Sequence, residues 1–131
     1  MQSDRSYRGL RVLLLEDDVF VRDICGRSLA KMGFEVRAVS DTEEGWRQLE
    51  AGGVDLMITD HHMPNATGLE LIERARERKL DTPCILISGN MPVVATTAIE
   101  KLGRARAMNK PFSIGDLRAV IGELIAPREQ T

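Results

Sequence analysis

Apolar residues gather into short runs that recur along the whole chain. Three runs, Val12–Leu15, Leu56–Ile58 and Cys84–Ile87, are continuous, which is typical of strands covered on both faces. Two further stretches, Phe34–Val39 and Arg104–Met108, alternate between apolar and polar residues, as strands with one partly solvated face do. We therefore expect three interior strands and two edge strands.

Between these runs, apolar residues recur at the spacing of an amphipathic helix. Asp18 precedes the first such stretch as a predicted N-cap, and Gly33 follows it as a predicted left-handed residue after the helix end. Two others begin with a capping-box pattern, at Ser40–Glu43 and Ser113–Asp116. The predicted helices cover residues 18–32, 40–52, a segment through 69–75, 92–102 and 113–125.

Strands and helices that alternate in this way predict an α/β fold with a parallel sheet and right-handed crossovers. With the second and fifth strands at the edges, we expect a doubly wound five-stranded sheet of order 2-1-3-4-5, the flavodoxin-like (βα)5 arrangement. The expected domain covers residues 9–126, between a flexible N-terminus at residues 1–8 and a tail at residues 127–131. Ligands of such sheets bind at the carboxyl ends of the strands.

Polar residues stand at the predicted carboxyl end of each interior strand. Glu16 and Asp17 follow the first strand, Asp60 ends the third, and Ser88 ends the fourth. Together the three carboxylates crowd negative charge into one cleft, which predicts a divalent cation such as Mg²⁺, with Lys110 after the fifth strand as a further positive charge. Such a site suits phosphoryl transfer, with Asp60 as the nucleophile and Ser88 as a hydrogen-bond donor to the phosphoryl oxygens.

Four motifs, taken in chain order, resemble the receiver domain of bacterial two-component response regulators over roughly residues 9–126. They are Leu13–Asp18, Asp55–Pro64 with Gly68, Ile87–Gly89 and Lys110–Phe112.

The resemblance implies a signalling switch that takes a phosphoryl group on Asp60 from a histidine kinase or a phosphotransfer protein. It also implies Mg²⁺ held by Asp17, Asp60 and the backbone carbonyl of His62, with Glu16 acting largely through water. The chain would then catalyse its own phosphorylation and dephosphorylation and would not be an enzyme in any other sense.

Other positions take their expected roles from the same resemblance. Ser88 and Lys110 match the family's hydroxyl and lysine positions, and the peptide bond before Pro111 is often cis in the family. His62 and Asn90 match the two positions that flank the path of attacking water. We expect these two side chains to set the lifetime of the phosphorylated state.

Two residues depart from the family pattern. Ala107 stands where the family usually carries an aromatic residue, and Gly89 stands where it more often carries alanine. Because Ala107 has no side chain to turn, we expect the signal to pass through a mobile loop, Ser88–Met91, and the start of the fourth helix. The alternative is that Ala107 leaves an open groove for a partner's side chain in both states.

Composition and charge limit the possible partners. The chain of 131 residues has 18 Lys and Arg against 20 Asp and Glu, a net charge of −2, which argues against a nucleic-acid or membrane surface. Cys25 and Cys84 are expected to be reduced core thiols. Without an apolar leader or membrane segment, the chain is expected to be cytoplasmic. Roughly five residues follow the last helix, so the expected output is a protein partner.

Four alternatives stay open at this point. The chain could be a receiver excised from a larger regulator or hybrid kinase, although it begins with Met1. A small Mg²⁺-dependent phosphatase with an aspartyl-phosphate intermediate would need a second acid–base carboxylate and a cap. A flavodoxin-like cofactor binder would need a Gly-rich phosphate loop. The triplet Asp60–His62 also resembles that of DHH phosphoesterases, which need further ligands; otherwise both histidines are expected to be exposed loop residues.

Overall fold

Five parallel strands form one sheet in the computed structural model, which describes residues 6–127. Their order is β2-β1-β3-β4-β5, so the predicted fold class and both edge strands are confirmed. Each strand pairs with its neighbours in parallel. The strands are β1 (Arg11–Leu15), β2 (Glu35–Val39), β3 (Leu56–Asp60), β4 (Cys84–Ser88) and β5 (Ala105–Asn109).

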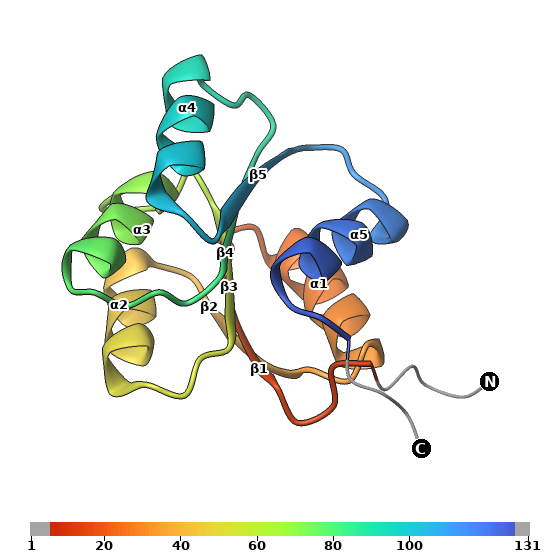
Figure 1. Cartoon of the computed structure of the whole chain (residues 1–131). Coiled ribbons are helices and arrows are strands. Elements are labelled where there is room, and N and C mark those ends of the chain that lie inside the picture. The colour runs from red at the N-terminus through yellow and green to blue at the C-terminus, as the bar shows by residue number, and fades with distance from the viewer. Residues whose placement is uncertain (1–5, 128–131) are drawn as a thin grey trace.

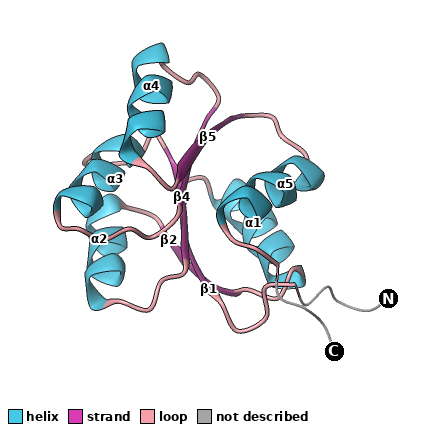
Figure 2. Ribbon diagram, in the orientation of Figure 1, coloured by secondary structure: helices cyan, strands magenta, loops and turns pink. Residues whose placement is uncertain are grey.

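Helices cover both faces of the sheet and make three layers (Figure 1). The helices form two groups, one on each face, as the ribbon coloured by secondary structure also shows (Figure 2). The first group is α1 (Val19–Lys31) and α5 (Ile114–Leu124); the second is α2 (Thr42–Ala51), α3 (Gly68–Glu77) and α4 (Val93–Leu102). None of the helices within residues 6–127 is both long enough and apolar enough to span a membrane.

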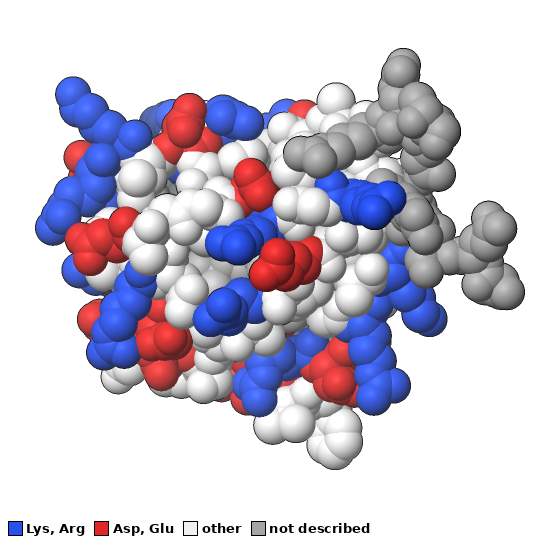
Figure 3. All heavy atoms as spheres, turned by 90° about the horizontal axis from the view of Figure 1, so that it is seen from below, with Lys and Arg blue, Asp and Glu red and all other residues white. Residues whose placement is uncertain are grey.

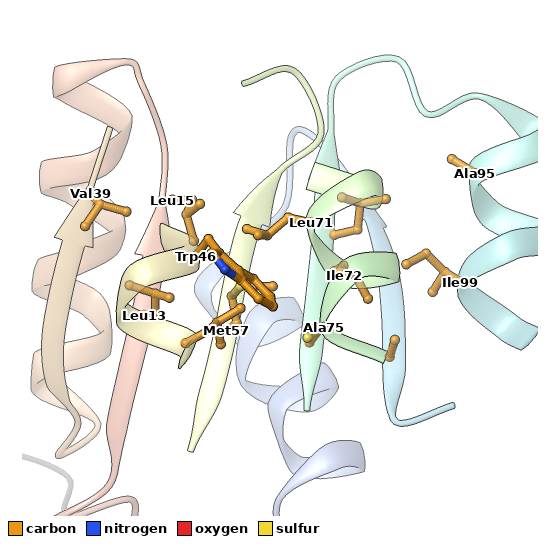
Figure 4. Close-up of a cluster of buried hydrophobic side chains, with 14 residues drawn as sticks. Leu13, Leu15, Val39, Trp46, Met57, Leu71, Ile72, Ala75, Ala95 and Ile99 are labelled. Carbon is orange, nitrogen blue, oxygen red and sulfur yellow. The ribbon is translucent and has the colours of Figure 1, made fainter. Parts of the chain in front are cut away.

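Two hydrophobic clusters fill the spaces between these layers. Successive residues of a strand point to opposite faces, so Leu13 and Leu15 of β1 pack toward α2 and α3, whereas Val12 and Leu14 pack toward α1 and α5. Figure 4 shows the first cluster, in which Trp46 of α2 lies over the sheet. Burial on both faces explains why the interior strands are continuous apolar runs.

The packed domain begins before its predicted start at residue 9. Tyr7 is almost fully buried, and its ring stacks on Phe34 with centroids 4.8 Å apart. Its backbone N–H also donates to the carbonyl of Met32 at 3.0 Å. The domain therefore reaches at least to Tyr7, while residues 1–5 and 128–131 of the predicted terminal segments lie outside the described residues.

Helix caps agree with the sequence pattern at two ends and differ at a third. Asp18 accepts from the backbone of Phe20 and Val21, and Ser113 forms its predicted capping box. The prediction of Ser40 as the cap of α2 is wrong, because the extended residue before this helix is Asp41, whose carboxylate accepts from the backbone N–H of Glu44 at 2.9 Å. This anionic cap satisfies an otherwise unpaired N–H of the first turn and also suits the helix dipole.

Charged side chains protect the β2 edge of the sheet. Arg11 and Glu35 pair across β1 and β2 with a nitrogen–oxygen distance of 3.4 Å, and Arg37 is exposed on β2. Charged edge strands resist pairing with other chains. On the face seen in Figure 3, basic and acidic side chains are interspersed.

Gly68 brings the start of α3 against the end of β3. A Cβ atom at this position would collide with the backbone carbonyl of Asp60 and the side chain of Leu86. The backbone N–H of Gly68 also donates to the carbonyl of His61 at 2.9 Å. Glycine is therefore required here, and it holds the loop of residues 61–67 close to the carboxyl edge of the sheet.

Candidate functional site

The carboxyl ends of the strands bring together three of the predicted site residues. Glu16 directly follows β1, Asp60 ends β3, and Lys110 directly follows β5. In the register of the sheet Leu15 lies beside Thr59, and Asp60 lies beside Ile87. Residues far apart in the sequence therefore meet at one edge, as the strand pattern predicted.

The Lys110 ammonium lies between two carboxylates. Its Nζ is 2.7 Å from Oδ2 of Asp60 and 3.0 Å from Oε1 of Glu16. All three side chains are largely withdrawn from solvent. Burial by itself lowers the pKa of Lys110, but the bonds from Asp60 and Glu16 outweigh it and raise that pKa above its ordinary value. Lys110 is thus a fixed positive charge at this edge.

Asp60 is an ionised carboxylate with a bond to each oxygen. Its Oδ1 accepts from the backbone N–H of His62 at 2.9 Å, and Oδ2 accepts from Lys110. Burial raises the pKa of Asp60, but the Lys110 ammonium and the His62 amide together hold it below the usual range for aspartate. The group is therefore charged at neutral pH and suited to act as a nucleophile.

Glu16 is more deeply buried than Asp60. Its Oε2 accepts from the backbone N–H of Asp18 at 3.1 Å, and its Oε1 accepts from Lys110. Burial raises the pKa of Glu16 above its ordinary value despite both bonds. One ammonium serves two carboxylates here, and the shorter contact belongs to Asp60.

Asp17 differs from these two residues because its side chain is exposed and makes no hydrogen bond or ion pair with residues 6–127. Across this part of the chain, no three His, Cys, Asp or Glu side chains converge on a point that could hold a metal ion. The donor set nevertheless fits Mg²⁺, which takes one or two carboxylates and keeps several waters. At this edge Glu16, Asp17 and Asp60 outnumber the single Lys110 ammonium, which leaves negative charge for a cation to balance.

Ser88 lies at the end of β4 and is fully buried. Its Oγ accepts from the backbone N–H of Asn90 at 3.1 Å, and its carbonyl accepts from the backbone N–H of Lys110 at 2.9 Å. The following residue, Gly89, has neither a left-handed φ nor any atom within 4 Å of the position that a Cβ would take. The fold therefore does not require glycine at position 89. The mobility of the loop Ser88–Met91 stays a prediction.

Ala107 and Pro111 flank the site on the β5 side. Ala107 lies beside Leu86 in the β4–β5 pairing and packs, partly buried, against the hydrophobic cluster on the α4 side. The peptide bond between Lys110 and Pro111 is cis, as the resemblance implied. Pro111 itself is exposed.

The prediction that both histidines are exposed loop residues is wrong for His61. The ring of His62 is exposed, but His61 is only 8% exposed, and its Nδ1 is buried without a hydrogen-bond partner within residues 6–127. Burial is the main reason that the pKa of His61 is lowered. The backbone explains the burial, because the N–H of His61 donates to the Ile87 carbonyl and so continues the pairing with β4.

Arg22 is a site residue that the sequence reasoning missed. Its Nη1 donates to the backbone carbonyl of Glu16 at 2.8 Å. The signal was present, because the Asp18 cap fixes where α1 starts, and Arg22 lies one helical turn later, where its backbone N–H donates to the Asp18 carbonyl. The capping box of α3, in which Thr67 and Glu70 bond reciprocally, was missed too although its spacing is visible in the sequence.

Residues 12–122 match the family model described as the response regulator receiver domain. The chain is 28% identical over 118 residues to the DNA-binding transcriptional regulator NtrC of Rhizobium meliloti (strain 1021), which covers 90% of this chain and 24% of that protein. It is 34% identical over 111 residues to the regulatory protein VirG of Agrobacterium tumefaciens (strain 15955), or 84% of this chain and 41% of that protein. The chain thus spans less than half the length of these relatives.

Solved structures share the fold. The receiver domain of the Francisella response regulator 1452 superposes with a TM-score of 0.80 at 23% identity, covering 88% of this chain and 96% of that one. The chemotaxis response regulator CheY4 of Vibrio cholerae gives a TM-score of 0.79 at 22% identity, covering 88% and 98%.

Replacing Lys110 by methionine removes the ammonium and leaves Glu16 and Asp60 partly buried without a cation. Burial then raises both carboxylate pKa values above those of the unfolded chain, so protonation favours the folded state. At pH 8 in metal-free buffer we expect Lys110→Met to lose about 2 kcal/mol of stability relative to the wild type. The loss should shrink as the pH is lowered to about 5, as measured by urea unfolding.

The Asp60 carboxylate of the wild type should contribute in the opposite way at acid pH. Its pKa lies below the unfolded value, so the stability that this group contributes is present above the unfolded pKa and is lost as the pH falls through the folded pKa. Lys101→Met, at an exposed position on α4, is the matched control and should follow the wild type. A Lys110→Met variant that loses stability in parallel with the wild type as the pH falls would contradict the assignment.

Proposed function

The chain belongs to the family of response regulator receiver domains, and we propose that it is a switch that takes a phosphoryl group on Asp60 from a histidine kinase or a phosphotransfer protein. The observation that carries the proposal is the Asp60 carboxylate at the end of β3, 2.7 Å from the Lys110 ammonium. A carboxylate next to a fixed positive charge can receive a phosphoryl group whose negative oxygens need neutralisation.

The chemistry of transfer follows from the groups at this edge. An ionised oxygen of Asp60 attacks the phosphorus of a phosphohistidine, and the phosphorus–nitrogen bond breaks as the new phosphorus–oxygen bond forms. The Lys110 ammonium stabilises the incoming phosphoryl oxygens, and the Ser88 hydroxyl is a hydrogen-bond donor to them. Both side chains belong to strand ends, which hold them in position without further ordering.

Mg²⁺ is the cofactor that the donor set fits. Asp17, Asp60 and the backbone carbonyl of His62 would hold it, with Glu16 acting through water. When bound, Mg²⁺ supplies positive charge that neutralises both the carboxylates and the phosphoryl oxygens. The buried carboxylate of Glu16 and its bond to Lys110 then keep that lysine close to Asp60.

The phosphoryl donor docks beside α1. Val19, Phe20 and Ile24 are large apolar side chains exposed on this helix, with Phe20 80% exposed. Ile114, at the start of α5 on the same face of the sheet, is also exposed. Exposed apolar side chains gathered beside a site are typical of a protein interface. Asp60 is only 9% exposed, so the phosphohistidine of a protein donor has to approach closely the edge of the sheet where Asp60 lies. A donor in that position covers the first turn of α1.

The output passes through the loop Ser88–Met91 and the start of α4. Ala107 has no aromatic ring to turn, so the family's usual coupling has no counterpart at this position. The N-cap of α4 is Pro92, which provides no side-chain hydrogen bond. Two valines of its first turn, Val93 and Val94, are 81% and 77% exposed. Few contacts therefore oppose a movement of this end of α4.

Asp60→Asn should abolish phosphorylation, because the amide cannot act as the nucleophile. Incubation of the wild type with acetyl phosphate and Mg²⁺ should add the mass of one phosphoryl group, as measured on the intact protein. Asp81→Asn, at an exposed position that pairs with Arg104, is the control and should be labelled normally. Labelling of Asp60→Asn at the wild-type level would show that the nucleophile is another residue.

Phe20→Ala should separate protein donors from small ones. Transfer from a histidine kinase that phosphorylates the wild type should slow by about tenfold, since exposed aromatic side chains are frequent hot spots of interfaces. Labelling by acetyl phosphate, which needs no docking surface, should be unchanged. The control is Val94→Ala on α4, and equal rates from the kinase for Phe20→Ala and Val94→Ala would refute the docking surface.

Beryllofluoride, a phosphoryl mimic, should change amide hydrogen exchange in the output region. We expect altered protection across Ser88–Met91 and the first turn of α4, because the Ser88 hydroxyl would donate a hydrogen bond to the mimic bound at Asp60. Helix α2, which packs on the sheet through Trp46, is the internal control and should be unaffected. An unchanged pattern in the loop and in α4 would rule out this route.

A further inference from the structure

The turn that follows β1 is held by a guanidinium from the next helix. Nη1 of Arg22 donates to the backbone carbonyl of Glu16 at 2.8 Å. That carbonyl belongs to the peptide group between Glu16 and Asp17, so the bond fixes the orientation of this peptide plane. Arg22 is itself fixed, because its backbone N–H donates to the carbonyl of Asp18, the N-cap of α1.

The backbone at Asp17 sets the direction in which its side chain points. Its carboxylate is exposed and has no hydrogen-bond or ion-pair partner within residues 6–127. The neighbouring residues are held, since the N–H of Glu16 donates to the Val39 carbonyl and the N–H of Asp18 donates to the Glu16 carboxylate. Arg22 provides the side-chain bond to the Glu16–Asp17 peptide itself. The direction in which the Asp17 side chain leaves the chain thus depends on that bond.

We propose that Arg22 is a positioning residue that aims Asp17 at the cation beside Asp60. Because Asp17 and Asp60 are ligands only under the proposed function, the role of Arg22 rests on it. The planar guanidinium of Arg22 can hold a carbonyl rigidly, because the Asp18 cap fixes where its helix begins. Loss of a group that orients a metal ligand commonly weakens metal affinity by 10- to 100-fold.

Electrostatics and positioning predict opposite effects of removing Arg22. Loss of a positive charge near an acidic site favours cation binding, because repulsion between the two cations disappears. Loss of the bond to the Glu16 carbonyl disfavours cation binding, because Asp17 has to be ordered at the moment of binding. A weaker affinity in the variant therefore identifies positioning.

The test is Mg²⁺ binding by calorimetry, at a temperature where every variant is folded. We expect Arg22→Ala to bind Mg²⁺ about tenfold more weakly than the wild type, and Arg22→Lys to lie between them. Arg27→Ala is the matched control, since Arg27 is on the same helix and pairs with Asp23 at 3.2 Å on the surface; it should bind like the wild type. Equal or tighter binding by Arg22→Ala would overturn the proposal.

Labelling kinetics give a second readout that a general loss of stability would not produce. With acetyl phosphate, Arg22→Ala should need about tenfold more Mg²⁺ for half-maximal labelling, while its rate at saturating Mg²⁺ equals that of the wild type. A reduced maximal rate with an unchanged Mg²⁺ requirement would overturn the positioning role and leave the proposed function intact. Failure of the wild type to bind Mg²⁺ or to be labelled would overturn both.

Discussion

The ammonium of Lys110 allows two carboxylates to share one edge of the sheet. Parallel pairing of β1 with β3 necessarily brings Glu16 and Asp60 together, since both stand at the carboxyl ends of neighbouring strands. Two partly buried negative charges repel each other unless a cation lies between them. Lys110 crosses from β5 to supply it. The charge of Asp60, and with it the chemistry proposed for the site, depends on this contact.

Much of the fold follows from patterns that burial imposes on the sequence. An interior strand covered on both faces has to be apolar at every position, so Val12–Leu15 and Cys84–Ile87 are recognisable without any tertiary information. The convergence of Glu16, Asp60 and Lys110 follows in turn, because parallel strands end at one edge. Their bonding could not be predicted, since it depends on how far the Lys110 side chain reaches across β4.

Features that depend on tertiary contacts could not be predicted from the sequence pattern. Ser40 and Asp41 are both good helix caps, and the choice between them depends on where the chain leaves β2. His61 is polar and precedes a loop, but its burial depends on the pairing of its backbone with Ile87. Tyr7 lies in a polar segment, and its place in the core depends on Phe34, an aromatic partner distant in sequence.

The strand pairing that assembles the site is also the one that joins the most distant segments of the chain. Val12 and Leu56, partners across β1 and β3, lie farther apart in sequence than the partners of any other pairing in the sheet. Closing a longer loop costs more conformational entropy, although the cost grows slowly with length. Glu16 and Asp60 meet only after this loop has closed. Under the proposed function, only a chain in which β1 and β3 have paired can take the phosphoryl group on Asp60, so a kinase would select molecules in which this pairing has formed.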